Sequence, residues 1–124
     1  MSKQKKLFLV VEDFEDSRFM MRRLLEMAGY RVVEASDGEQ AVRMATERHP
    51  ALILMDLSLP KLDGLAATRQ IRKKKGLHNV PIVAVSAHDS PHTRAEALAA
   101  GCDEYVTKPI DFDILKGVFQ RYLS

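Results

Sequence analysis

Several short apolar runs of this chain end on polar side chains whose types could do chemistry together. Residues 51–55 form such a run and lead directly into a carboxylate. A run of this kind, followed by a turn, is typical of a strand buried on both faces of a sheet. In open sheets of parallel strands, ligands and reactions gather at the carboxyl ends of the strands. We expect one pocket there, formed by Glu12, Asp13, Asp56, Ser86 and Lys108.

The residue types in this set indicate phosphoryl transfer. Three carboxylates packed together raise each other's pKa unless a cation neutralises them, and Mg2+ suits such a set of oxygen ligands. Lys108 adds a positive charge opposite the acids, and Ser86 adds a hydroxyl that can bond an anionic oxygen. Catalysis of phosphoryl transfer is mostly positioning plus charge neutralisation. A carboxylate can be the nucleophile and carry an acyl phosphate, and we assign that role to Asp56.

Two other chemistries lack their partners in the sequence. His88 and His92 are close to Ser86, but no Gly-x-Ser-x-Gly turn surrounds this serine as a hydrolase would need. The histidines and the cysteine show no zinc-ligand spacing. Cys102 has no second cysteine to pair with, so we interpret it as a structural thiol in a reducing cytoplasm.

Helical patterns separate the apolar runs and must position the polar residues. We predict strands at about residues 7–11, 31–35, 51–56, 81–86 and 104–107, and helices at about 16–28, 38–49, 64–75, 91–100 and 112–122. Strict alternation implies right-handed crossovers and an α/β fold with a parallel sheet covered by helices on both faces. A flavodoxin-like order 2-1-3-4-5 and half of a Rossmann fold both fit. Residues 11–16 contain no glycine to cradle a dinucleotide phosphate, which favours 2-1-3-4-5.

The helices carry further expectations. Asp16 and Ser17 are predicted to cap the first helix, and its apolar face is predicted from the spacing of Phe19, Met20, Leu24 and Met27. The third helix ends in four basic residues, 72–75, which suit the negative end of a helix dipole and which we interpret as solvated.

Size and charge set the outer limits. A chain of 124 residues predicts one domain, residues 1–124, and we expect no output domain. Its net charge of +2 favours neither nucleic acid nor a membrane as the main partner. The apolar run after the basic start, residues 7–11, is too short for a signal peptide or a membrane span.

The combination of motifs resembles a known family. Over about residues 7–123 the chain resembles receiver domains of two-component response regulators, in particular the single-domain, chemotaxis-regulator type. The motifs that carry this resemblance are Val11-Glu12-Asp13-Phe14, Met55-Asp56-Leu57-x-Leu59-Pro60-x-Leu62-Asp63-Gly64, Val85-Ser86-Ala87 and Ala100-Gly101-Cys102-Asp103-Glu104-Tyr105-Val106-Thr107-Lys108-Pro109.

The resemblance implies roles for the acids and for Lys108. Asp56 accepts a phosphoryl group from a histidine kinase or a histidine phosphotransfer protein. Mg2+ is bound by Asp13, Asp56 and the backbone carbonyl of Ser58, with Glu12 acting through water. Lys108 pairs with the phosphoryl oxygens, and its bond to the following proline is cis in this family.

The resemblance also implies how the signal leaves the site. Ser86 reorients to bond the phosphoryl group, and Tyr105 then changes rotamer. Ser replaces the more usual Thr at position 86, which predicts looser coupling. Ser58 and His88 occupy positions that modulate the lifetime of the phosphoryl group in this family.

The function that follows is a signalling switch of a two-component system or phosphorelay. It is not an enzyme with a separate substrate, although it assists its own phosphorylation and slow autodephosphorylation. We expect a cytoplasmic monomer or weak dimer that signals through an unknown protein target or passes the phosphoryl group on.

Two alternatives from other classes stay open on the sequence. A phosphatase or phosphotransferase that turns over through an aspartyl phosphate usually has a second Asp two residues after the nucleophile, where this chain has Ser58. A flavodoxin-like flavin-binding module would need a phosphate-binding loop after the first strand, where Glu12 and Asp13 would repel a phosphate.

Overall fold

Five apolar runs form one parallel sheet in the computed structural model, which describes residues 5–123. The strands of that range are β1 Leu7–Val11, β2 Arg31–Ala35, β3 Leu52–Asp56, β4 Ile82–Ser86 and β5 Glu104–Thr107. The helices are α1 Glu15–Met27, α2 Gly38–Arg48, α3 Gly64–Arg72, α4 Pro91–Ala100 and α5 Phe112–Leu123. Strands and helices alternate strictly, as predicted.

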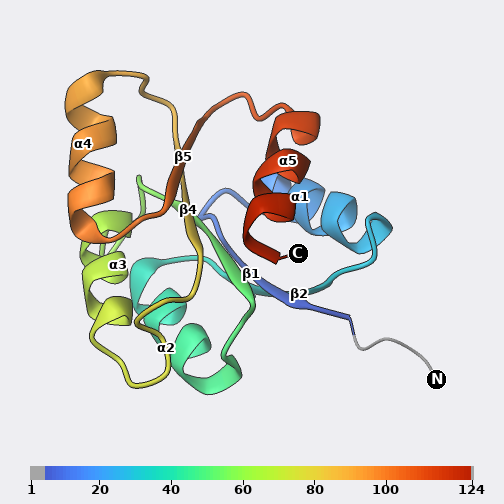
Figure 1. The fold of residues 1–124 in the computed structure, drawn as a ribbon, viewed down its shortest axis with the longest axis horizontal. Helices are drawn as coiled ribbons and strands as arrows, with labels where there is room; N and C mark the ends of the chain where they lie inside the picture. The colour runs from blue at the N-terminus through green and yellow to red at the C-terminus, as the bar shows by residue number, and fades with distance from the viewer. Residues whose placement is uncertain (1–4, 124) are drawn as a thin grey trace.

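The strand order is β2-β1-β3-β4-β5, so the flavodoxin-like prediction is confirmed. Figure 1 shows α2, α3 and α4 on one side of the sheet and α1 and α5 on the other. Every pair is parallel, and β1 lies between β2 and β3, with Val11 in register with Ala35 on one side and Met55 on the other. The ends of β1, β3, β4 and β5 therefore deliver their following residues to one edge of the sheet.

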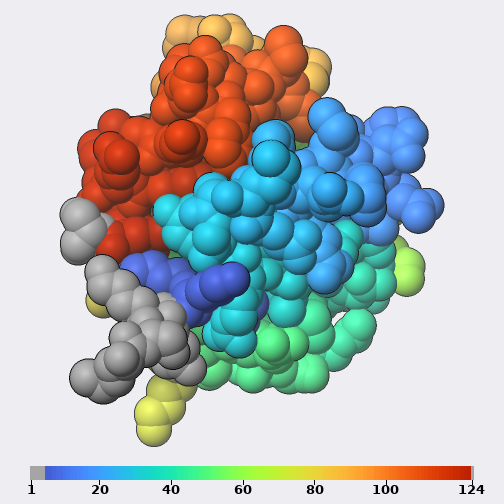
Figure 2. All heavy atoms as spheres, turned by 90° about the vertical axis from the view of Figure 1, so that its right-hand side faces the viewer, coloured from blue at the N-terminus to red at the C-terminus, as the bar shows by residue number. Residues whose placement is uncertain are grey.

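Two separate cores sit on the two faces of the sheet, because alternate side chains of each strand point to opposite sides. One core packs the sheet against α2, α3 and α4, and it includes Leu9, Ala41, Ile53, Ile71 and Ala97. The other packs it against α1 and α5, and it includes Phe8, Val10, Leu25, Leu54 and Phe119. Figure 2 views the α1 side, where α1 (blue) and α5 (red) lie next to each other.

Side chains cap α2 and α4, whereas the cap predicted for the first helix is wrong. Asp37 caps α2 and Ser90 caps α4, each through its side-chain oxygen. In α1 the N-cap is Phe14, which has no capping side chain, and Asp16 and Ser17 lie inside the helix. The reason is the short connection from β1, because only residues 12–14 separate the strand from the helix.

The predicted apolar face of α1 is also wrong. Phe19, Met20 and Met27 are 56%, 63% and 79% exposed, whereas Leu25 is fully buried. Met21 packs with Leu25 into the core that α1 shares with α5. The helix is apolar on more than one side, and the packing of α5 selects the side that is buried.

The third helix ends earlier than predicted. It stops at Arg72, and residues 73–76 form a turn that closes at Gly76 with a φ of +84°. Among the described residues, no helix is both long and apolar enough to span a membrane.

Candidate phosphoryl-acceptor site

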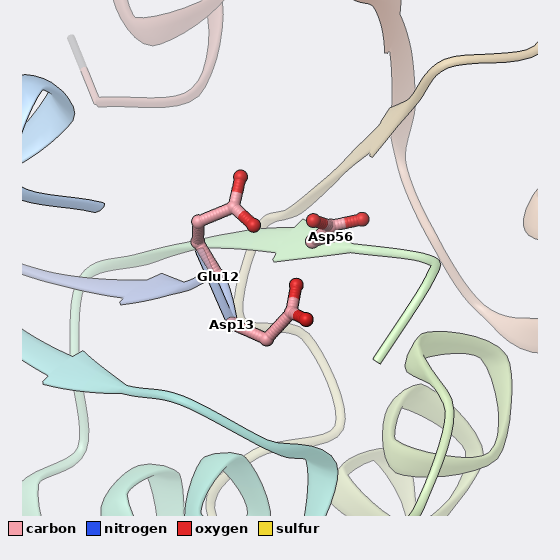
Figure 3. Close-up of side chains that lie close together, drawn as sticks. All are labelled: Glu12, Asp13 and Asp56. Carbon is pink, nitrogen blue, oxygen red and sulfur yellow. The ribbon is translucent and has the colours of Figure 1, made fainter. Parts of the chain in front are cut away.

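Three carboxylates meet where β1 and β3 end side by side. Glu12 and Asp13 follow β1, and Asp56 is the last residue of β3 (Figure 3). One carboxylate oxygen of each residue lies within 4.8 Å of one from the other two. Asp56 and Glu12 are buried, and Asp13 is exposed. The structure therefore brings together the three acids that the sequence predicted would share a pocket, with Asp13 on the solvent side.

Lys108 closes the pocket from the end of β5. Its Nζ atom lies 3.1 Å from Oε1 of Glu12 and 3.1 Å from Oδ2 of Asp56, so one ammonium group bridges two buried carboxylates. Burial raises the pKa of Glu12, and the nearby Asp56 carboxylate raises it further. Burial by itself would lower the pKa of Lys108, but the bonds to Asp56 and Glu12 outweigh it and raise that pKa. Three acids and one base still leave the pocket with an excess of negative charge.

The backbone holds the carboxylates in place. Oδ1 of Asp56 accepts a hydrogen bond from the amide of Ser58 at 2.9 Å, and Oε2 of Glu12 accepts one from the amide of Phe14 at 3.1 Å. Gly64 packs against the backbone of Asp56, where an added Cβ atom would lie 2.3 Å from the Asp56 carbonyl oxygen. Only a glycine lets α3 begin so close to the central acid. The peptide bond between Lys108 and Pro109 is cis, as the resemblance implied.

Ser86 and Tyr105 are linked through the backbone of His88. The hydroxyl of Ser86 accepts a hydrogen bond from the amide of His88 at 3.0 Å, and the phenol of Tyr105 donates one to the carbonyl of His88. Tyr105 is buried, and the guanidinium of Arg94 lies 4.7 Å from the centre of its ring. The sequence does not predict the contact between Arg94 and Tyr105, because Arg94 lies in α4 and Tyr105 in β5.

A mainly apolar groove, which sequence reasoning missed, runs beside Asp56. Its volume is about 360 Å³, and it lies between α1, the ends of β1, β3 and β4, and the segment after β5. Its walls include Met20, Met21, Leu24, Ile110 and Phe112, and Glu12, Asp56 and Lys108 also line it. Met20, in the wall of the groove, is 63% exposed. The carboxylates therefore sit beside a surface on which a protein could dock.

Comparison with known proteins decides the family. The model of the family described as response regulator receiver domain matches residues 8–120 of this chain. The chain belongs to this family. It is a receiver domain of two-component signalling, as the resemblance in its motifs implied.

The most similar curated relatives include a response regulator of comparable length. The polar-differentiation response regulator DivK of Brucella ovis is 33% identical over 119 residues, which cover 96% of this chain and 97% of DivK. The receiver domain of the sensor histidine kinase PA1611 from Pseudomonas aeruginosa is 38% identical with a TM-score of 0.89, and the match covers 96% of this chain and 98% of that one. That neighbour was solved with a magnesium ion coordinated in its active site cleft.

A third neighbour was solved with a partner. The receiver domain of Ssk1 from Saccharomyces cerevisiae, in complex with the histidine phosphotransfer protein Ypd1, is 31% identical with a TM-score of 0.87; the match covers 95% of this chain and 88% of that one. Membership of the receiver family removes the basis for the flavin-binding alternative, which rested on the fold alone. Cys102 is buried beside Thr68, and burial raises its thiol pKa, which fits the structural role predicted for it.

Proposed function

We propose that Asp56 accepts a phosphoryl group from a phosphohistidine of a histidine kinase or a histidine phosphotransfer protein. One observation carries this proposal: Asp56 is a buried carboxylate held on Oδ1 by the Ser58 amide and on Oδ2 by Lys108. Its carboxylate lies at the meeting point of the other two acids. Glu12 shares the contact with Lys108, but its side chain is more exposed than that of Asp56, 11% against 4%.

The donor set fits Mg2+. Glu12, Asp13 and Asp56 offer hard oxygen atoms close together, and the exposed position of Asp13 leaves access for a hydrated ion. We assign Asp13, Asp56 and the carbonyl of Ser58 as ligands, with Glu12 acting through water. When bound, the ion would neutralise charge on the phosphoryl oxygens. The excess of acids over bases in the pocket supports this assignment.

The transfer itself needs few parts. A carboxylate oxygen of Asp56 attacks the phosphorus atom, a P–O bond forms, and the P–N bond to the donor's imidazole breaks with its electron pair leaving on nitrogen. The ammonium of Lys108 can bond the phosphoryl oxygens after transfer, since it already lies 3.1 Å from Oδ2 of Asp56. The hydroxyl of Ser86 accepts from the His88 amide and still has its own proton to donate to a phosphoryl oxygen.

The apolar groove supports the assignment of the phosphodonor. A donor histidine must approach Asp56 from the protein surface, and the groove between α1 and the segment after β5 borders Asp56 and Lys108. Met20, which is 63% exposed in the wall of the groove, offers apolar area for a protein contact next to this opening. The Ypd1–Ssk1 complex shows that a receiver of this fold pairs with a phosphotransfer protein.

Readout passes through His88 to Tyr105 in this proposal. Ser86 and Tyr105 bond to the amide and the carbonyl of the same residue, so a movement of Ser86 toward a phosphoryl group would shift the partner of the Tyr105 phenol. Tyr105 is already 7% exposed, so phosphorylation has little room to bury it further. The expected change is the loss or shift of its bond to His88 and of its contact with Arg94.

The protein acts as an acceptor rather than as an enzyme that turns over an external substrate. Hydrolysis of its own acyl phosphate is expected to be slow, because Ser58 stands two residues after Asp56 and offers no carboxylate to activate water. A cytoplasmic location suits partners that carry phosphohistidine.

A phosphotransfer assay tests the proposal. A histidine phosphotransfer domain carrying a labelled phosphoryl group is mixed with the protein and Mg2+, and the label is followed on both chains. Label is expected on the wild-type protein and not on the Asp56→Asn variant. Transfer to Asp56→Asn at the wild-type rate would show that another residue is the acceptor.

A further inference from the structure

Arg18 connects the acid pocket to the edge of the sheet. It lies in the second turn of α1, and its side chain is 18% exposed. Its Nη1 atom donates a hydrogen bond to the backbone carbonyl of Glu12 at 2.9 Å, and its Nε atom bonds Oε1 of Glu34 at 2.8 Å. One guanidinium thus joins the β1–α1 turn to β2.

The other backbone group of Glu12 is also fixed from β2. Its amide donates to the carbonyl of Ala35 at 3.0 Å, next to Glu34 in β2. Glu12 and Asp13 are consecutive residues of a turn that is only three residues long. Where their carboxylates point therefore depends on how this short piece of backbone is held, and Arg18 holds the carbonyl that joins the two residues.

We propose that Arg18 is a positioning residue that holds the Glu12–Asp13 turn in the geometry that binds Mg2+. The inference rests on the function proposed above, because it needs the three acids to be a metal site. A planar guanidinium suits the task, since its fixed fork can satisfy a carboxylate and a carbonyl at once.

Charge alone does not explain the placement of Arg18. Glu34 neutralises it: burial raises the pKa of Glu34, but the bonds from Arg22 and Arg18 outweigh that and lower it, so Glu34 is ionised at neutral pH. Arg18 therefore acts on the pocket through its bond to the Glu12 carbonyl. Groups that orient metal ligands commonly change metal affinity by about tenfold or more when removed.

Arg22 provides a matched control on the same helix. It also pairs with Glu34, at 2.5 Å, and with Glu26, at 3.2 Å, and these acids are its partners in the described part of the chain. Substituting Arg22 removes one positive charge and one bond to Glu34 without touching the Glu12 carbonyl. A difference between the two variants therefore reports on the bond to the turn.

The test is a Mg2+ titration of the wild-type protein, Arg18→Ala, Arg18→Lys and Arg22→Ala, by calorimetry and by the amide NMR signal of Asp13. Urea unfolding is measured alongside, so that affinity is compared among folded proteins. We expect affinity about tenfold weaker for Arg18→Ala and unchanged within about twofold for Arg22→Ala. Arg18→Lys keeps the charge but loses the fork, so its affinity is expected to be reduced as well. It carries the test if Arg18→Ala does not fold.

Two results would overturn the inference. Wild-type affinity in Arg18→Ala or Arg18→Lys would show that the bond to the Glu12 carbonyl is not needed, and an equal loss in Arg22→Ala would show that only charge matters. A wild-type protein that binds no Mg2+ would instead overturn the proposed metal site, and the inference with it. Phosphorylation by acetyl phosphate separates the effects further, since Arg18→Ala should need more Mg2+ for half-maximal rate and reach the wild-type maximum.

Discussion

Two cations, at opposite edges of the same sheet, have very different partners. Arg72 lies where β4 and β5 begin, and it donates to the backbone carbonyls of Gly101, at 2.7 and 2.9 Å, and Val80, at 2.6 Å. It also pairs with Asp103 at 2.8 Å. Lys108 lies where the strands end, and both of its partners are carboxylate side chains.

This difference in partners indicates a structural role for Arg72 and a functional role for Lys108. The fold fixes the backbone carbonyls that Arg72 bonds, so these bonds do not exchange. The carboxylate of Asp103 neutralises the charge of Arg72. Asp103 in turn accepts from the amide of Ile82 at 2.9 Å. The carboxylates around Lys108 outnumber it, and they can change partner when a cation or a phosphoryl group arrives. Function is expected at the edge where the charges do not balance.

Removing Arg72 should give the largest change in stability. Arg72→Ala leaves the carbonyls of Gly101 and Val80 without this donor and Asp103 without its cation, so the free energy of unfolding should fall by about 3 kcal/mol. Urea unfolding measures this, with Arg121→Ala as the control, because Arg121 is 58% exposed in its pair with Glu104. A loss no larger than that of the control would remove the contrast between the two edges.

Removing Lys108 should instead act on function. Lys108→Ala is expected to slow phosphorylation by acetyl phosphate about a hundredfold, and to change the unfolding free energy by only about 1 kcal/mol, since the side chain is a third exposed. Lys61, on the surface beside Asp37, is the control. Added Mg2+ should stabilise Lys108→Ala at least as much as the wild-type protein, because the three acids remain. Phosphorylation at the wild-type rate would contradict the role of Lys108.

The pH dependence of stability should have opposite signs at two glutamates. The pKa of Glu12 is raised above 4.5 in the folded protein. Its contribution to the free energy of unfolding is therefore present below pH 4.5 and is lost as the pH rises through that raised pKa. The pKa of Glu34 is lowered, so its contribution is present above pH 4.5 and is lost as the pH falls through the folded value. With a chelator present, Glu12→Gln should flatten the stability curve above pH 4.5 and Glu34→Gln below it. Identical curves for the two variants would contradict this assignment.

The smallest effect is expected at His88. Its backbone joins Ser86 to Tyr105, and His88→Ala keeps that backbone, so the substitution tests the exposed side chain alone. We expect the half-life of the phosphorylated protein to change severalfold, with His92→Ala as the control, because His92 is 85% exposed and faces Glu96. An unchanged half-life would limit the role of His88 to its backbone.

The fold and the acid pocket were predictable from local sequence. Alternating apolar runs and helical patterns predict a parallel sheet, and the rule that chemistry gathers at its carboxyl edge predicts that Asp13, Asp56 and Lys108 lie together. The order of strands followed from one negative observation, the lack of glycine after β1.

The features that the sequence did not predict depend on contacts between residues far apart in the chain. The buried side of α1 depends on α5, so the spacing of Phe19 and Met20 alone selected the wrong face. Arg72 stood in a run of basic residues that looked solvated, and its partners Gly101 and Asp103 lie about thirty positions away. Arg18 gave no signal either, because its partner Glu34 is sixteen residues away on another element.

The most direct test is the intact mass of the protein after incubation with acetyl phosphate and Mg2+. Wild-type protein, Asp56→Asn and Asp103→Asn are compared, so that a carboxylate from each edge of the sheet is removed in turn. The wild-type protein and Asp103→Asn are expected to gain the mass of one phosphoryl group, and Asp56→Asn none. A gain that survives in Asp56→Asn, or no gain in the wild-type protein, would contradict the account.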